Sequence, residues 1–196
     1  LLVFVVVMCS GLYYRGVLTF LPELLRDLPG FEPIPIETLL PPSVLSALGI
    51  EAGTGQTLKP QDYFYAGLLL IGVLGQYAGG KLSDRIPVEY GIAGSFLVLS
   101  VLAVLFVPVS AMGFGPLAVL GALLGVALFV VQPMYQAAVA EHTPAGTRGL
   151  SYGFTYLGVF GVGALGGGLA GSILAFANAT ALFGTLAGIA LVAVLA

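Results

Sequence analysis

The polar side chains best suited to bind a small molecule lie together in an otherwise apolar part of the chain. Gln132, Tyr135 and Gln136 follow an apolar run that begins near residue 115. Their spacing of three and four residues places them on one side of a helix. Amide and phenol groups are unfavourable next to hydrocarbon, so this side belongs in a bundle interior or in a wet cavity. There the groups would either line a substrate cavity or bond neighbouring helices.

Arg15 is the fourth candidate for a substrate cavity. It lies within the first apolar run of the chain, next to Tyr13 and Tyr14. A charged side chain near the centre of a membrane helix costs about 2.5–3.5 kcal/mol even on insertion scales, which makes such a residue a candidate for function. The alternative is that the side chain reaches the outer boundary, about 10 Å away by helix rise if the run ends near residue 22. The sequence leaves both explanations open.

The chain offers little else for catalysis or metal binding. Cys9 is the only cysteine, which excludes an intrachain disulfide and a cysteine-based metal cluster. His142 is the only histidine, and we expect it to be solvated in a short polar turn. Residues 149–153 match the G-x-S-x-G pattern of serine hydrolases around Ser151, but that pattern needs a strand–turn–helix context that the sequence does not predict. We predict no catalytic residue, no metal and no cofactor.

The elements that must position these side chains are membrane-spanning helices. Hydrophobic residues make up 59% of the sequence and charged residues 8%, whereas soluble domains are about a quarter charged. Apolar runs of roughly 20 residues match the length that a helix needs to cross a bilayer. The sequence therefore predicts an all-α polytopic membrane protein with six transmembrane helices. We place the spans near residues 1–22, 63–80, 90–108, 115–138, 149–175 and 177–196.

The basic residues predict how the chain is oriented in the membrane. Lys81 and Arg85 follow the second span and Arg148 follows the fourth, while the turns after the third and fifth spans have no Lys or Arg. Basic loops stay in the cytoplasm, so the long loop over residues 26–62 is expected outside. That loop carries leucines and a valine at spacings compatible with one face of a short helix, namely Leu39, Leu40, Val44, Leu45 and Leu48.

The turn between the second and third spans reads Gly-Gly-Lys-Leu-Ser-Asp-Arg over residues 79–85. It resembles the G-x-L-x-D-R loop signature of the major facilitator superfamily, which recurs in both halves of those transporters. The resemblance implies that Gly80, Asp84 and Arg85 form a cytoplasmic latch that contacts the other half of the molecule. A glycine at this point allows close approach of two helix ends, and an aspartate can accept backbone N–H bonds. An ordinary charged turn is the alternative, and residues 87–89 depart from the family's usual continuation.

A second resemblance lies in residues 143–149, because similar P-x-x-x-R-G turns occur between the fourth and fifth spans of facilitator halves. The fifth span is dense in glycine. Gly163, Gly167 and Gly171 recur every four residues, and small residues along one helix face let membrane helices approach closely. We predict that these three glycines serve helix packing, with substrate access along the same face as the alternative.

These features together resemble the C-terminal six-helix half of a facilitator, close to efflux-type and fosmidomycin-resistance-like members. The chain opens inside one apolar run at Leu1 and stops inside another at Ala196, so we expect residues 1–196 to be a fragment that lacks the N-terminal half. The resemblance implies secondary active transport of a small molecule by alternating access, with drug or metabolite efflux by an antiporter in the plasma membrane. An intramembrane serine hydrolase and a six-span channel are the alternative functions.

The expected partners are a small-molecule substrate, the lipid bilayer and the missing half. A proton is the expected coupling ion, and the missing half would supply its carboxylate, because no Asp or Glu lies in the middle of a span. Nucleic acid is excluded as a partner, because a chain with a formal charge of −3 and no basic patch cannot neutralise phosphates.

Overall fold

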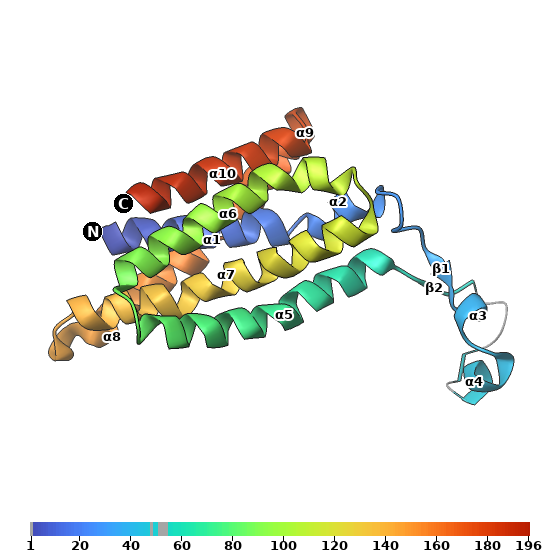
Figure 1. The fold of residues 1–196 in the computed structure, drawn as a ribbon, viewed down its shortest axis with the longest axis horizontal. Helices are drawn as coiled ribbons and strands as arrows, with labels where there is room; N and C mark the ends of the chain where they lie inside the picture. The colour runs from blue at the N-terminus through green and yellow to red at the C-terminus, as the bar shows by residue number, and fades with distance from the viewer. Residues whose placement is uncertain (1, 48, 51–54) are drawn as a thin grey trace.

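The computed structural model describes residues 2–47, 49–50 and 55–196, most of which lie in long helices (Figure 1). In chain order the bundle contains α1 (Leu2–Leu18), α2 (Leu21–Arg26), α5 (Pro60–Ser83), α6 (Val88–Ser110), α7 (Phe114–His142), α8 (Arg148–Tyr156), a π-helical segment η2 (Leu157–Val162), α9 (Leu165–Phe176) and α10 (Ala179–Leu195). A 3-10 turn, η1 (Ala145–Thr147), precedes α8. Helices suit a chain this apolar, because they satisfy their own backbone groups where no water is present.

Four stretches in the described part of the chain are long and apolar enough to cross a membrane. They are Leu2–Arg26, Val88–Ser110, Phe114–His142 and Arg148–Phe176. Of the other two long helices, α10 is apolar but has 17 residues, and α5 has 24 residues but is more polar. The predicted all-α, multi-pass class is therefore confirmed, whereas the number of six spans stays a prediction.

The connections between helices alternate between the two ends of the bundle. Both termini lie at one end, together with the turns over residues 84–87 and 143–147 (Figure 1). The loop over residues 27–59 and the turns at 111–113 and 177–178 lie at the opposite end. Lys81, Arg85 and Arg148 therefore share one end of the molecule, which is the arrangement that the positive-inside rule requires. Which end faces the cytoplasm stays a prediction.

The first long helix is interrupted between α1 and α2. Pro22 has no N–H group to bond to the carbonyl of Leu18, so the regular helix pattern breaks at residues 19 and 20. Bonds from Thr19 N–H to the Arg15 carbonyl and from Leu24 N–H to the Phe20 carbonyl carry the chain across the break. The helical stretch extends to Arg26, four residues beyond the predicted end of the first span near residue 22.

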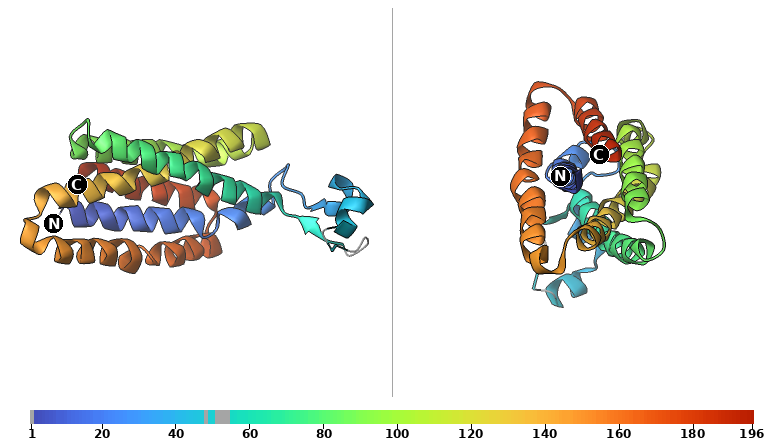
Figure 2. Two further views of the ribbon diagram at one scale, coloured as in Figure 1. Left: turned by 90° about the horizontal axis from the view of Figure 1, so that it is seen from below. Right: turned by 90° about the vertical axis from the view of Figure 1, so that its left-hand side faces the viewer.

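Helix α1 is the central element of the bundle. It contacts α10 on one side and α9 with η2 on another, and it also touches α7 (Figure 2). Helices α6 and α10 pack closely, with the Phe106 and Phe183 rings stacked at 4.0 Å between centroids. The Ser100 hydroxyl donates a buried bond of 3.2 Å to the Ala187 carbonyl across the same contact.

Helices α5 and α7 form the most extensive helix pair and pack through glycines on both sides. A Cβ built on Gly75 would collide with the Val126 carbonyl, and one built on Gly125 would lie 2.5 Å from the Leu68 carbonyl. Only glycine permits backbones to come this close, as is common between membrane helices. These glycines were not among the packing positions predicted from the sequence.

The loop between α2 and α5 folds into a small unit that projects beyond the end of the bundle (Figures 1 and 2). Strand β1 (Ile34–Pro35) pairs with β2 (Thr57–Leu58) in antiparallel register. The short helices α3 (Ile36–Leu39) and α4 (Pro42–Ala47) lie between the two strands in the sequence. The alternative of one helical face does not occur among the described residues, because Leu40 is extended and Pro41 lies between the two short helices. Leu45 is buried while Leu39 is exposed, and Leu48 lies outside the described residues.

Candidate functional site

A cavity of about 270 Å³ opens between α1, α7 and the α8–η2 segment. Arg15, Gln132, Tyr135 and Gln136, the four candidates from the sequence, all line it. The structure therefore brings together residues that are about 120 positions apart in the sequence. Four aromatic residues that were not predicted from the sequence also line it, namely Tyr14, Phe129, Tyr156 and Phe160.

Helix α7 supplies the amide side of the cavity. The Gln76 side chain on α5 donates a hydrogen bond of 3.2 Å to the Gln132 Oε1 atom, which ties the two helices together beside the cavity. Gln136 is exposed, and its main-chain carbonyl accepts a bond of 3.4 Å from the Tyr152 hydroxyl. Pro133 leaves a carbonyl of α7 without its helical donor and favours a kink at this point. Gln132 thus has one interhelical partner, whereas the Gln136 side chain is available to a ligand.

Helix α1 supplies the charged side of the cavity. Arg15 is exposed, and no carboxylate in the described part of the chain lies within ion-pair distance of it. It precedes Arg26, the end of the helical stretch, by 11 positions, which is about 16 Å of helix rise. Both explanations of Arg15, a substrate contact and a side chain that reaches the outer boundary, stay predictions. The neighbouring Tyr14 ring meets the Phe129 ring of α7 edge-on at 5.8 Å.

The third wall includes a π-helical segment, which the sequence analysis did not predict. Gly163 N–H bonds to the Gly158 carbonyl five positions earlier, at 2.9 Å. Such segments are rare and often occur at functional sites. Tyr156 and Phe160 stack at 5.9 Å and are both more than half exposed. Glycines before, within and after η2 were the only signal in the sequence, and they are equally compatible with an ordinary helix.

The three glycines predicted to serve packing face α1 and the break that follows it. A Cβ built on Gly163 would lie 2.7 Å from the Gly11 Cα atom. The corresponding Cβ on Gly167 meets the Thr19 side chain at 3.2 Å, and that on Gly171 meets the Phe20 ring at 3.0 Å. The tightest approach is therefore at Gly163, directly beside the cavity.

The predicted latch residues lie at the end of α5, away from the cavity. Asp84 caps α5 and is exposed, as is Arg85, and neither has an ion pair among the residues that the structure describes. A Cβ built on Gly80 would meet nothing within 4 Å among the described residues, so its role in a close approach stays a prediction. Gly79 does make a close approach, since its Cβ would lie 2.6 Å from both Pro133 Cγ and the Val130 carbonyl.

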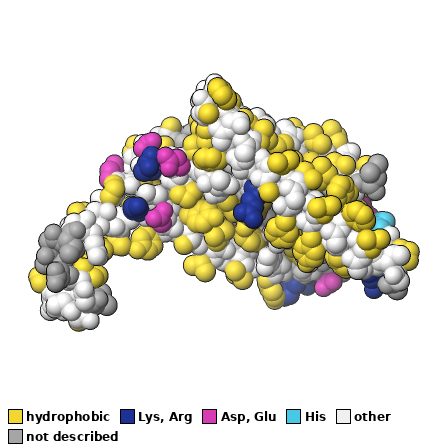
Figure 3. All heavy atoms as spheres, turned by 180° about the vertical axis from the view of Figure 1, so that it is seen from behind, with side chains coloured by type: hydrophobic (Ala, Val, Ile, Leu, Met, Phe, Trp, Pro, Cys, Tyr) yellow, Lys and Arg dark blue, Asp and Glu magenta, His cyan; other side chains and the backbone are white. Residues whose placement is uncertain are grey.

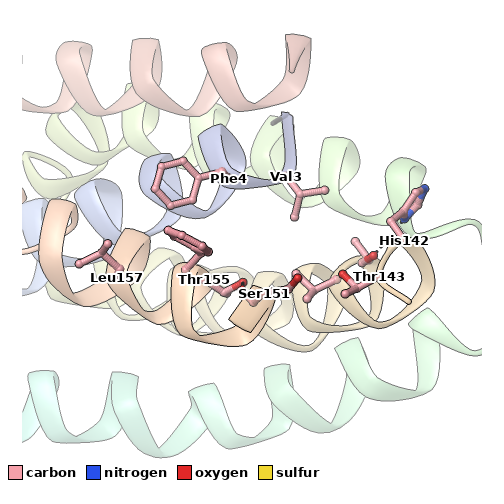
Figure 4. A pocket seen from close by; sticks show the side chains of 10 residues that line it. Val3, Phe4, His142, Thr143, Ser151, Thr155 and Leu157 are labelled. Atoms are coloured by element: carbon pink, nitrogen blue, oxygen red, sulfur yellow. Dashed lines mark hydrogen bonds between the residues drawn. The ribbon is translucent and has the colours of Figure 1, made fainter. Parts of the chain in front are cut away.

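A second cavity, of about 500 Å³, lies at the end of the bundle that holds the termini (Figure 4). Ser151 and His142 both line it, and Thr143 lies between them in that view. His142 Nδ1 donates a bond of 2.9 Å to the Ala138 carbonyl, and its Nε2 faces Glu89 Oε1 at 3.7 Å. No hydrogen bond between Ser151 and His142 is present among the described residues, and Ser151 lies inside a helix rather than at a strand–helix elbow. The arrangement does not support a serine hydrolase.

The surface of the bundle is mainly apolar, as Figure 3 shows from behind, with most charged side chains toward the ends. A family model described as Major Facilitator Superfamily matches residues 3–196 of the chain. None of the curated proteins matches it.

Proposed function

The chain belongs to the major facilitator superfamily, and from this premise we propose that it is one six-helix half of a secondary carrier working by alternating access. The superfamily consists of membrane transporters, so membership indicates transport of small molecules across a bilayer. The proposal adds the number of spans, the half-molecule arrangement and the mechanism.

The observation that carries the proposal is the exposed polar wall of the 270 Å³ cavity. Arg15, Gln136 and Tyr156 are exposed there, on a bundle whose surface between its two ends is mainly apolar. Hydrocarbon contact would be costly for a charge and an amide at this depth. A second half of the molecule placed against this wall would cover it and enclose a substrate site near the bilayer midplane, as inverted or parallel repeats do in secondary transporters.

The remaining helices complete a six-span half. Helix α5 lies along α7 through its glycines, and α10 lies along α6, so both run in the same bundle as the four apolar stretches. The exposed ends of α5 and α8 carry Asp84, Arg85 and Arg148 on the side that we assign to the cytoplasm. We propose that Asp84 and Arg85 form the latch with the second half, and that the protein acts in efflux at the plasma membrane.

Saturation of transport with substrate concentration tests the proposal. Intracellular metabolites would first be compared by mass spectrometry between cells that overproduce the full-length protein and cells that overproduce its Asp84→Asn variant. Compounds depleted only by the wild type would then be followed in vesicles that contain the purified protein. A carrier gives a flux that saturates, whereas a channel gives a linear flux and a conductance. No difference between the two cell lines and no flux in vesicles would contradict the proposed function.

A further inference from the structure

The wall of the 270 Å³ cavity carries one formal charge, the guanidinium of Arg15. Its remaining polar groups in the described part of the chain are neutral amides and hydroxyls, and no acidic side chain lines it. The described residues also give Arg15 no carboxylate within ion-pair distance and no hydrogen-bond acceptor. The cavity is therefore positively charged and its charge is unneutralised by this half.

The aromatic residues around Arg15 limit the shape of what can bind beside it. Tyr156 and Phe160 stack with an interplanar angle of 17°, so they present two roughly parallel rings side by side along the π-helical wall. Tyr14 and Phe129 form an edge-on pair across α1 and α7. Aromatic faces of this kind favour a flat apolar body in offset or edge contact.

We propose that this cavity binds a small organic anion with a planar apolar body, whose carboxylate or similar oxyanion pairs with Arg15. This inference rests on the proposed function, because it names the class of substrate for the same site. A guanidinium presents a planar fork of N–H donors that fits a carboxylate through two parallel hydrogen bonds. The anion would neutralise the Arg15 charge, which has no ion pair among the residues that the structure describes.

Two other groups on the wall are placed to help select such a ligand. Gln136 is exposed on the α7 side, with an amide that can donate to a second oxygen of the ligand. Gln132 already accepts a bond from Gln76, so its own N–H donors remain for the cavity. An organic cation, by contrast, would meet the Arg15 charge without any acidic residue on this wall to offset the repulsion.

Protection of Arg15 from phenylglyoxal tests the proposal. This reagent modifies accessible arginines, and mass spectrometry of the purified full-length protein reports each arginine separately. Benzoate, benzamide and benzamidinium are matched probes, because they share a ring and a planar head group but carry charges of about −1, 0 and +1 at neutral pH. We expect benzoate to protect Arg15 and the other two probes to leave it reactive. Arg26, which pairs with Glu23 outside the cavity at 2.6 Å, should react equally in all three.

Binding of labelled benzoate to two variants provides the second measurement. Arg15→Gln should weaken binding about tenfold or more, as expected for loss of a hydrogen bond to a charged group, while Arg26→Gln should bind as the wild type does. Equal protection by all three probes, preference for benzamidinium, or no benzoate binding would overturn the proposal. Equal protection would be the result if a carboxylate from the second half already neutralised Arg15. None of these outcomes contradicts saturable transport. Conversely, binding of labelled benzoate without a flux of any tested compound in vesicles would contradict the proposed transport while supporting the anion site.

Discussion

The Tyr13 hydroxyl donates a buried hydrogen bond of 2.7 Å to the main-chain carbonyl of Leu99, and so joins α1 to α6. Its neighbour Tyr14 lies on the cavity wall instead. Successive residues of a helix point about 100° apart, so two adjacent tyrosines serve different surfaces. The first belongs to the core of the bundle, and the second to the site at which we propose that substrate binds.

Tyr13→Phe should lower the stability of the protein and leave transport kinetics unchanged. Removing the phenol leaves the Leu99 carbonyl without its side-chain donor, which typically costs about 0.5–1.5 kcal/mol. Tyr14→Phe is the matched control, because no hydrogen bond from the Tyr14 hydroxyl is present in the described structure. Melting curves in detergent would show the difference, and equal melting temperatures for both variants would contradict the structural role of Tyr13.

Gly163→Ala should destabilise the bundle by about 1–3 kcal/mol, because the added methyl group would force α9 and η2 away from Gly11. Gly168→Ala lies in α9 with open space around its Cβ, so it should be neutral or slightly stabilising. Thermal unfolding of the two variants in the same detergent separates the effects. A Gly163→Ala protein as stable as Gly168→Ala would mean that the close approach to α1 is not required.

Gln136→Leu should change the apparent affinity for substrate more than it changes stability. The Gln136 side chain is exposed on the cavity wall and has no helix partner in the described structure. Gln132→Leu should change both the apparent affinity and the stability, because it also removes the oxygen to which the Gln76 amide donates its hydrogen bond. Transport kinetics measured beside melting curves distinguish the two. Unaltered kinetics in both variants would remove these glutamines from the candidate site.

Asp84→Asn in the full-length protein should reduce the rate of transport with little loss of folded protein. The substitution keeps the size of the side chain and removes its charge at the exposed end of α5, where we propose contact with the second half. Asp62→Asn, at the other end of the same helix, is the control that should transport normally. If both variants transport at the wild-type rate, Asp84 is an ordinary solvated turn residue.

The orientation of the chain predicts which introduced cysteines are accessible from outside the cell. After Cys9→Ser has removed the native thiol, a cysteine at Ser83 or Gly146 should be shielded from an impermeant thiol reagent. A cysteine at Ser43, in α4 of the projecting loop, should react. Labelling of intact cells followed by gel shift measures this, and external labelling at Ser83 would reverse the orientation.

The sequence predicted the class of fold well, because a hydrophobic content this high leaves helices as the only economical way to cross a bilayer. It also selected Arg15, Gln132, Tyr135 and Gln136, which the structure places on one cavity. Polar groups in apolar runs are conspicuous, so each could be found without knowing which helices are neighbours. Their role in binding stays a prediction.

Features that depend on the contact between helices were harder to predict. Gly79 and Gly80 look equivalent in the sequence, but only the first faces α7. The aromatic residues Tyr156 and Phe160 are common in membrane helices, and nothing in their types distinguishes a cavity wall from a lipid-facing side. The end of the first helical stretch was placed four residues early because Pro22 interrupts the helix without ending it.

The π-helical turn at residues 157–162 has a consequence for the history of this chain. A π-turn uses one residue more than an α-turn for the same rotation, so it commonly corresponds to a single inserted residue. A relative with a regular α-helix here would align with this chain only through a one-residue gap in the middle of a span. A gapless alignment that matches Tyr156 correctly would then misassign Gly163, on the other side of the turn, by one position.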